Sequence, residues 1–172
     1  MKILITGGSG FLGKSLVNSL QDLGDVFYTT RNKTSDPQAI TADFTSASLK
    51  EEYDVIIHNA AFIPTPEYEN NLMCFNVNYH GTKAFIANNA SPSTKIIYIG
   101  SLAIYGGASG TITAHSVPKP DSDYSRSKLS AEEVLPKKSY IIRPGTIYGP
   151  GMSPQRFISH ATKAIKNNED LE

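Results

Sequence analysis

The sequence predicts an α/β protein with a doubly wound parallel sheet, and two patterns along the chain predict it. Short apolar segments, too brief to form helices, alternate with longer segments of helical periodicity. The first apolar segment runs directly into a glycine-rich turn, which a helix follows. Strands with nearly continuous apolar centres are typical of a parallel sheet that helices cover on both faces.

The glycine-rich turn lies within residues 1–13, which read MKILITGGSGFLG. Four glycines separate the strand at residues 3–5 from the helix: Gly7, Gly8, Gly10 and Gly13. Glycines permit positive φ angles and let a phosphate approach the backbone, and the helix directs its free N–H groups at the anion. A glycine turn without a ligand is the alternative, but the order of strand, turn and helix favours a bound dinucleotide.

The other elements continue the alternation of strands and helices. Further strands are expected at residues 26–30, 39–42, 54–58, 95–99 and 140–143. Besides the helix after the glycines, helices are expected at about residues 70–90, 123–135 and 154–167. Helical crossovers of one hand place such strands in a Rossmann-type sheet, which binds ligands at the carboxyl ends of its strands.

Composition narrows the class of protein. A chain of 172 residues is expected to form one domain, and its 16 basic residues balance its 16 acidic ones, which argues against nucleic acid or an acidic membrane as a partner. The single cysteine, Cys74, excludes an internal disulfide and fits a reducing compartment. Because no apolar run approaches the ~20 residues of a membrane span and no signal-peptide pattern precedes the first strand, we expect a cytoplasmic protein.

The end of the second strand indicates which dinucleotide is bound. NAD sites usually have an acidic residue there, which binds the ribose 2′-hydroxyl. This chain has Thr30 followed by Arg31, whose guanidinium could pair with a 2′-phosphate. Arg31 therefore favours NADP over NAD. The alternative is that Arg31 is an exposed loop residue that binds no ligand.

Polar and small residues follow the next two strands. Asp43 could accept a hydrogen bond from an adenine amino group beside the backbone of Phe44, or it could cap the segment that begins at Thr45. The small residues at 59–61 would let the backbone pass close to the ribose and pyrophosphate. His58 is interpreted as a residue of the strand and not as a ligand.

Three side chains could carry chemistry. Tyr124 and Lys128 are four residues apart and share one face of the expected helix. A nearby ammonium lowers the pKa of a phenol from its usual value of about 10, so Tyr124 could exchange a proton with a substrate oxygen while hydride moves to or from a nicotinamide. Ser101, at the end of the fifth strand, could hold the same oxygen.

Five motifs in this order resemble the extended short-chain dehydrogenase/reductase family, the branch of NAD-dependent epimerases and dehydratases. TGGSGFLG at 6–13 is similar to its TGxxGxxG motif, and NVNYHGT at 76–82 contains NxxGT starting at Asn78. SLAIYG at 101–106 resembles SxxVYG, YSRSK at 124–128 matches YxxxK, and RPGTIYGP at 143–150 matches RPxxxYGP.

The resemblance implies an enzyme with a Ser/Tyr/Lys site formed by Ser101, Tyr124 and Lys128. It implies NADP or NAD as the cofactor, a small-molecule substrate such as a nucleotide sugar, and no metal ligand. The implied cofactor-binding residues are Gly7, Gly10, Phe11, Leu12, Gly13, Arg31, Asp43, Phe44, Asn59, Ala60, Ala61, Asn78, Tyr124, Lys128 and Pro144.

Two departures from the family pattern narrow this function. The 4,6-dehydratases of the family carry acidic residues directly after the catalytic Ser or Thr, whereas this chain has Leu102 and Ala103, which cannot transfer protons. That leaves an epimerase or a carbonyl reductase. Family members also continue into a substrate-binding subdomain, so we expect residues 1–170 to be a truncated NAD(P)-binding domain, and the closing Leu-Glu at 171–172 resembles the remnant of a purification tag.

A second hypothesis is a non-catalytic NAD(P) sensor on the same fold, which would also bind a protein partner. A sensor has no use for Ser101, Tyr124 and Lys128, and all three are present in register. The sequence therefore favours an enzyme. It leaves the substrate, the choice between epimerase and reductase, and a homodimer open.

Overall fold

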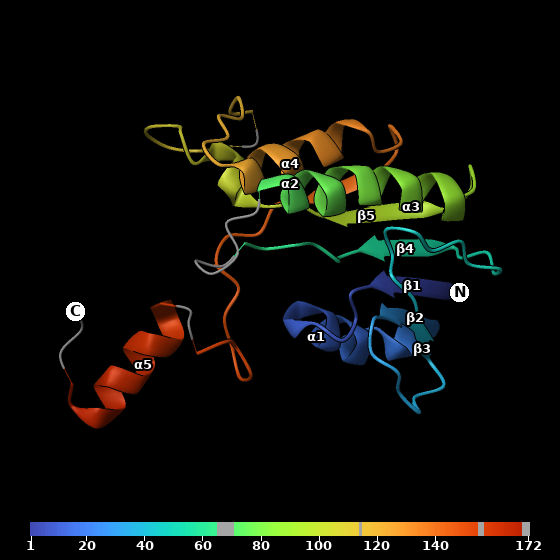
Figure 1. Cartoon of the computed structure of the whole chain (residues 1–172), viewed down its shortest axis with the longest axis horizontal. Helices are drawn as coiled ribbons and strands as arrows, with labels where there is room; N and C mark the ends of the chain where they lie inside the picture. Colours follow the sequence, from blue (N-terminus) through green and yellow to red (C-terminus); the bar gives the residue numbers. More distant parts are fainter. Residues whose placement is uncertain (65–70, 114, 155–156, 170–172) are drawn as a thin grey trace.

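The computed structural model describes residues 1–64, 71–113, 115–154 and 157–169, and its core is one parallel sheet of six strands (Figure 1). The strands are β1 (Lys2–Thr6), β2 (Asp25–Thr30), β3 (Ala39–Thr41), β4 (Val55–His58), β5 (Lys95–Ile99) and β6 (Tyr140–Ile142). Their order across the sheet is β3-β2-β1-β4-β5-β6. The order reverses between β1 and β4, which is the doubly wound arrangement that the sequence predicts.

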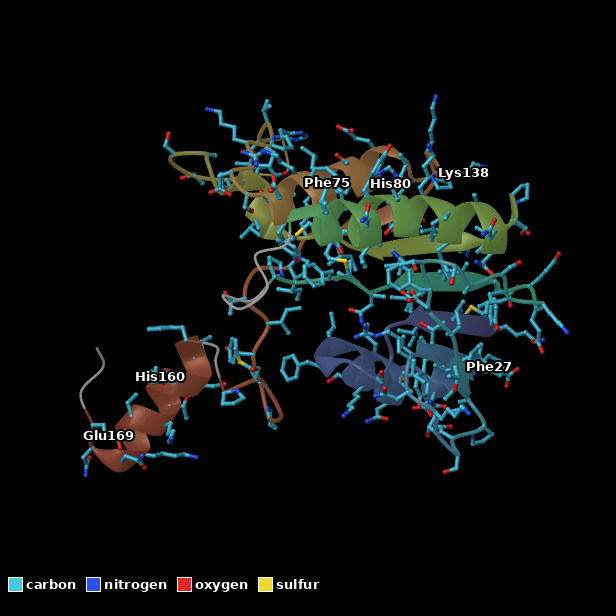
Figure 2. All side chains as sticks on the ribbon, in the orientation of Figure 1. Phe27, Phe75, His80, Lys138, His160 and Glu169 are labelled. Carbon is cyan, nitrogen blue, oxygen red and sulfur yellow. The ribbon has the colours of Figure 1, made fainter. Side chains whose placement is uncertain are left out.

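Helices cover both faces of this sheet (Figure 1). The longer ones are α1 (Phe11–Ser19), η2 (Cys74–Gly81), α3 (Thr82–Asn89), α4 (Asp123–Glu133) and α5 (Phe157–Asn167). Two short helices, η1 (Gln21–Leu23) and η3 (Leu102–Tyr105), lie in the connections, and α2 (Asn71–Met73) leads directly into η2. Helix α5, which carries His160, lies apart from the sheet (Figure 2).

Alternating side chains of the strands build two apolar clusters. On the face covered by α3, Leu4 and Ile56 pack with Phe85, and on the opposite face Ile3 and Ile5 pack with Val17 of α1. Because the centres of β1 and β4 are buried on both sides, these strands read as unbroken apolar runs in the sequence. At the edge, β6 is short, and 64% of Tyr140 and 51% of Ile142 are exposed.

The helix expected at residues 70–90 is present, with one difference. Its described part, residues 71–89, passes from α2 through a π-helical segment, η2, before α3 continues as an ordinary helix. Such segments carry one extra residue per turn and are frequent at functional sites. Among the described residues, no helix is long and apolar enough to cross a membrane.

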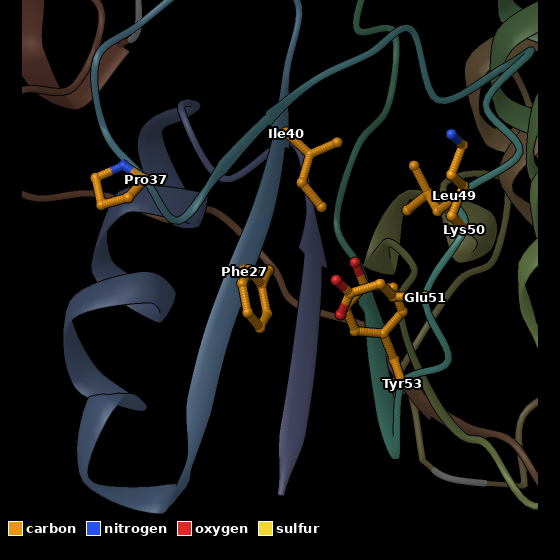
Figure 3. A pocket seen from close by; sticks show the side chains of 7 residues that line it. All are labelled: Phe27, Pro37, Ile40, Leu49, Lys50, Glu51 and Tyr53. Atoms are coloured by element: carbon orange, nitrogen blue, oxygen red, sulfur yellow. The ribbon is translucent and has the colours of Figure 1, made fainter.

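A recess of about 290 Å³ lies between β2, β3 and the segment at residues 49–53 (Figure 3). It is lined by Phe27, Pro37, Ile40, Leu49, Lys50, Glu51 and Tyr53. A second recess, of about 590 Å³, lies between residues 148–152 and α5. The first recess opens beside the middle of β2 and β3, away from the carboxyl ends of the strands where the predicted site residues lie.

A buried chain of hydrogen bonds fixes the carboxyl ends of β1 and β4. The Thr6 hydroxyl oxygen accepts from the backbone N–H groups of Asn59 and Ala60, each at 3.0 Å, and it lies 2.9 Å from Nδ1 of His58. Since both lone pairs of the hydroxyl are used, its proton is donated to Nδ1. The proton of the ring is then on Nε2, which donates to the Thr82 hydroxyl at 2.8 Å.

His58 is therefore held neutral in the interior. Its ring is stacked between Phe85 and Tyr98, with centroid distances of 5.5 and 5.8 Å. Complete burial, with the Lys128 charge as a smaller cause, lowers the pKa of His58 from 6.5 to about 3. Protonation would place an extra hydrogen on Nδ1 and would break the bond from Thr6.

The neutral His58 gives a prediction about acid stability. Because its folded-state pKa is below the unfolded value, its stabilising contribution is complete above pH 6.5 and is lost as pH falls from 6.5 toward 3. The slope approaches ~1.4 kcal/mol per pH unit only below pH 6, so about 1.6 kcal/mol should be lost between pH 6.5 and 5. Urea unfolding of the wild type and of His58→Gln across this range measures the difference. Parallel pH profiles for the two proteins would contradict a neutral His58.

Candidate active site

The glycines of the turn have different tasks. Gly7 has φ +66°, and a Cβ atom on it would lie 3.0 Å from the Ala60 backbone. A Cβ atom on Gly13 would lie 2.2 Å from the Gly7 carbonyl oxygen, and one on Gly8 would overlap the ring of Tyr28. These three glycines are therefore required by the packing of the turn itself.

Gly10 differs from the other three. It precedes α1 in an extended conformation, and a Cβ atom there would meet a single neighbour, the Gly7 carbonyl oxygen at 3.2 Å. It is exposed, and the first N–H groups of α1, from Phe11 onward, have no carbonyl one turn before them within the helix. The turn thus presents uncovered backbone donors and the positive end of a helix dipole, an arrangement that fits a pyrophosphate.

The ends of β2 and β3 place the predicted adenosine-binding residues at the same edge of the sheet. Arg31 is exposed directly after β2. The Asp43 carboxylate accepts from the backbone N–H and the hydroxyl of Thr45, at 3.0 and 2.8 Å. The Phe44 ring packs edge-on against His58 and Phe85, so its side chain belongs to the core and only its backbone is available to a ligand.

Asn59, Ala60 and Ala61 follow β4 and lie beside the glycine turn. The Asn59 side-chain amide donates to the Gly7 carbonyl at 3.3 Å, and the Ala60 backbone lies against Gly7. All three residues are half-buried. This strand end and the glycine turn therefore form one rigid unit.

The NxxGT motif holds that unit against the helices. The Asn78 side chain accepts from the Phe62 backbone N–H at 2.7 Å and donates to the Phe62 carbonyl at 3.0 Å and to the Ser127 hydroxyl at 3.1 Å. A Cβ atom on Gly81 would lie 2.7 Å from a methyl group of Thr45. Asn78, buried within the π-helical segment, thus bonds to the loop after β4 and to α4.

Helix α4 begins with a capping box. The Ser122 side chain accepts from the Ser125 backbone N–H at 3.2 Å, and the Ser125 hydroxyl lies 3.0 Å from the Ser122 backbone nitrogen. Such a box fixes the first helical turn. Half-buried Tyr124 lies in that turn, and its carbonyl accepts from Ser127 at 2.8 Å.

Lys128 is 2% exposed, one turn after Tyr124. Its Nζ donates to the Ile99 carbonyl at 2.8 Å and lies 4.3 Å from the centre of the Tyr98 ring. Burial lowers the pKa of Lys128 from 10.5 to about 7, although the Glu132 carboxylate opposes this shift. Two residues after Ile99, the hydroxyl of Ser101 caps η3 by accepting from the Ala103 backbone N–H at 3.1 Å.

The sequence analysis assigned no role to four residues of this region, although two of them, Tyr105 and Arg143, lie within the motifs at 101–106 and 143–150. Arg143, at the end of β6, donates to both carboxylate oxygens of Glu132 and to the hydroxyl of Tyr105. The fourth, Tyr98, places its ring beneath Lys128. The spacing of Glu132, four residues after Lys128 on α4, could have indicated that both side chains lie on one face. Pro144 accepts from the Leu102 backbone N–H at 2.9 Å.

Comparisons with known proteins agree with this geometry. GDP-6-deoxy-D-talose 4-dehydrogenase of Aggregatibacter actinomycetemcomitans is 28% identical, with 100% of this chain and 62% of that protein aligned. The solved structure of MoeE5 in complex with UDP-glucose and NAD is 26% identical, with a TM-score of 0.78 over 95% of this chain and 60% of that one. A hypothetical dTDP-4-dehydrorhamnose reductase from Sulfolobus tokodaii is also 26% identical, with a TM-score of 0.75 over 86% of this chain and 57% of that one.

The chain spans less than two thirds of the length of each of these relatives. The model of the NAD dependent epimerase/dehydratase family matches residues 3–172, which is nearly the whole sequence. The sheet order and the motifs agree with that match, so the resemblance seen in the sequence is confirmed. The chain belongs to the NAD dependent epimerase/dehydratase family.

Proposed function

We propose that the complete protein is an NAD(P)-dependent epimerase or carbonyl reductase that acts on a nucleotide sugar. The observation that carries this proposal is the position of Lys128, a buried amine at the carboxyl end of β5. It lies one helical turn from Tyr124 and against the end of β5, two residues before Ser101. Relatives whose names specify a GDP-sugar or a dTDP-sugar, and one solved with UDP-glucose and NAD, support the substrate class.

Residues 1–170 would be the cofactor domain. The backbone of Gly10, Phe11, Leu12 and Gly13 would hold the pyrophosphate, and residues 59–61 would pass beside it. Arg31, Asp43 and the Phe44 backbone would contact the adenosine half, and Pro144 would lie near the other half. The nicotinamide, when bound, supplies the position that accepts or gives up hydride. Asn78 would act through the Phe62 loop, because its amide oxygen and nitrogen already bond to the protein.

Tyr124, Lys128 and Ser101 would then divide the proton chemistry. The Tyr124 phenol would give a proton to a substrate oxygen as a carbonyl is reduced, or take one as a hydroxyl is oxidised. An ammonium at Lys128 would stabilise the phenolate, and the Ser101 hydroxyl would donate to the same oxygen. Leu102 and Ala103 carry no group for removing water from a sugar, so the proposal excludes a dehydratase.

The buried lysine also favours an enzyme over a cofactor sensor. Transfer of an ammonium out of water is costly, and a group with a strongly shifted pKa at a ligand-binding edge is characteristic of active sites. A sensor would need the glycine turn but would not need an amine beside Tyr98 and the Ile99 carbonyl.

The glycine turn can be tested by two substitutions that should separate binding from folding. Gly10→Val places its side chain where the pyrophosphate must lie, next to a single close atom, so the protein should fold and lose NAD(P) binding. Gly13→Ala directs a methyl group at the Gly7 carbonyl oxygen and should instead reduce the folded fraction. Calorimetric titration and thermal unfolding measure the two effects. Unchanged cofactor affinity in folded Gly10→Val would refute the phosphate site.

Arg31 can be tested for the choice of cofactor. Arg31→Ala should weaken NADP binding by about 1.5–3 kcal/mol, the range of a charge-assisted hydrogen bond, and should leave NAD binding nearly unchanged. Lys33→Ala removes a charge from the same exposed loop and is the matched control. Equal losses for NAD and NADP, or a wild type that prefers NAD, would show that Arg31 does not recognise the 2′-phosphate.

Catalysis can be tested in the complete protein. Tyr124→Phe should lower turnover on the order of 10²–10⁴-fold with nearly unchanged cofactor affinity, because only the hydroxyl is lost. Lys128→Met should lower turnover and also weaken cofactor binding, and its residual activity should rise at higher pH, where the phenolate forms unaided. Tyr140→Phe, on the exposed edge strand, is the control for loss of a tyrosine hydroxyl. Wild-type turnover in Tyr124→Phe would refute Tyr124 as the acid/base and would make the YxxxK spacing a coincidence.

A further inference from the structure

We propose that Arg143 is a positioning residue that holds the segment carrying Ser101 and the helix carrying Tyr124 and Lys128 at a fixed separation. This inference rests on the proposed function for its catalytic consequence, but its structural basis is independent of it. The three interacting side chains, Arg143, Glu132 and Tyr105, are called the arginine clamp below.

Backbone hydrogen bonds fix the segment of Arg143 against the segment of Ser101. The residues on either side of Ser101 both bond to the segment that contains Arg143. The Gly100 N–H donates to the Ile142 carbonyl at 2.7 Å, and the Leu102 N–H donates to the Pro144 carbonyl at 2.9 Å. Ser101 is therefore fixed relative to the backbone of residues 142–144.

The Arg143 side chain binds Glu132 of α4. The Arg143 Nη2 donates to a Glu132 carboxylate oxygen at 2.7 Å, and Nε lies 3.2 Å from each of the two oxygens. Only 4% of the Glu132 side chain is exposed, against 30% of Arg143, so the carboxylate is shielded from water and would be costly to leave without its partner. A Cβ atom on Gly100 would lie 2.7 Å from a Glu132 oxygen, so glycine at 100 is what admits the carboxylate.

The third contact returns to η3. The Arg143 Nη1 donates to the Tyr105 hydroxyl, and Tyr105 is 6% exposed at the end of the short helix that Ser101 caps. One guanidinium thus binds η3 and α4 at the same time. Helix α4, which carries both Tyr124 and Lys128, also packs directly on η3.

The fork of an arginine is required for this arrangement. Its planar group has five donors in fixed directions, so it can bind a carboxylate with two nitrogens and a hydroxyl with the third. A lysine keeps the charge for Glu132 but offers only one nitrogen for both partners. Displacement of catalytic groups by about 1 Å can lower a rate by about 10²-fold, so loss of one arm should be visible in turnover.

The clamp is tested with conservative variants of the complete protein. Arg143→Lys keeps the charge beside Glu132 and avoids an unpaired buried carboxylate, and Tyr105→Phe removes only the hydroxyl that accepts from Nη1. Arg126→Lys is the matched control, because Arg126 is an exposed arginine of α4 paired with Asp123. The readouts are hydrogen exchange of the amides at 102–106, kcat on nucleotide sugars, and affinity for NAD(P).

We expect faster exchange at 102–106 and a kcat about 10- to 100-fold lower in Arg143→Lys, with cofactor affinity within about twofold of the wild type. The double variant Arg143→Lys/Tyr105→Phe should lose less than the product of the two single losses, because both variants release the same contact. Arg126→Lys should match the wild type in every readout.

Unchanged exchange in Arg143→Lys would overturn the clamp, and faster exchange with unchanged kcat would overturn its positioning role. A parallel loss of cofactor affinity would overturn it too, because that would indicate general loosening of the fold. A wild-type protein that turns over no nucleotide sugar would instead refute the proposed function, and exchange at 102–106 would then still decide whether Arg143 joins η3 to α4.

Discussion

The hydrogen bonds from Thr6 to His58 and from His58 to Thr82 are the contacts on which the rest of the site depends. They join the strands β1 and β4 to each other and to α3. The strand order reverses between these two strands. The same Thr6 oxygen holds the backbone of Asn59 and Ala60 beside the glycine turn. Since the network is fully buried, a missing partner would leave an unsatisfied polar group, so the network specifies one arrangement of these elements.

A second polar chain organises the other half of the site. Lys128 and Glu132 lie one turn apart on the buried face of α4, and the Glu132 charge is shared with Arg143. Burial lowers the pKa of Lys128, whereas the Glu132 carboxylate raises it. The Glu132 carboxylate thus binds Arg143, directly after β6, and also raises the pKa of the Lys128 amine on its own helix.

Periodicity was sufficient to predict the sheet, because strands buried on both faces, such as β4, have an unmistakable apolar run. The turn glycines were recognisable because their spacing reflects close backbone contacts. The partners of His58 and the pairing of Glu132 with Arg143 were not predictable. They depend on which side chains meet across the sheet at long sequence separation, and a single sequence contains no signal for that. The π-helical segment was also missed, because the sequence does not reveal that the side chain of Asn78, in the middle of a helix, bonds to the distant loop at Phe62. The assignments to cofactor and catalysis remain predictions.

The contacts divide the motif residues into two groups with different meanings. Gly7, Gly13 and Asn78 make close contacts or hydrogen bonds within the protein, so this chain needs them for its packing whether or not it is an enzyme. Gly10 has a different status, because a Cβ atom on it would meet a single close neighbour and the packing of the turn does not require a glycine there. Lys128 goes further, since its burial opposes the charge that it would carry in water. A charged residue that is costly to bury indicates function more specifically than the motifs that build the scaffold around it.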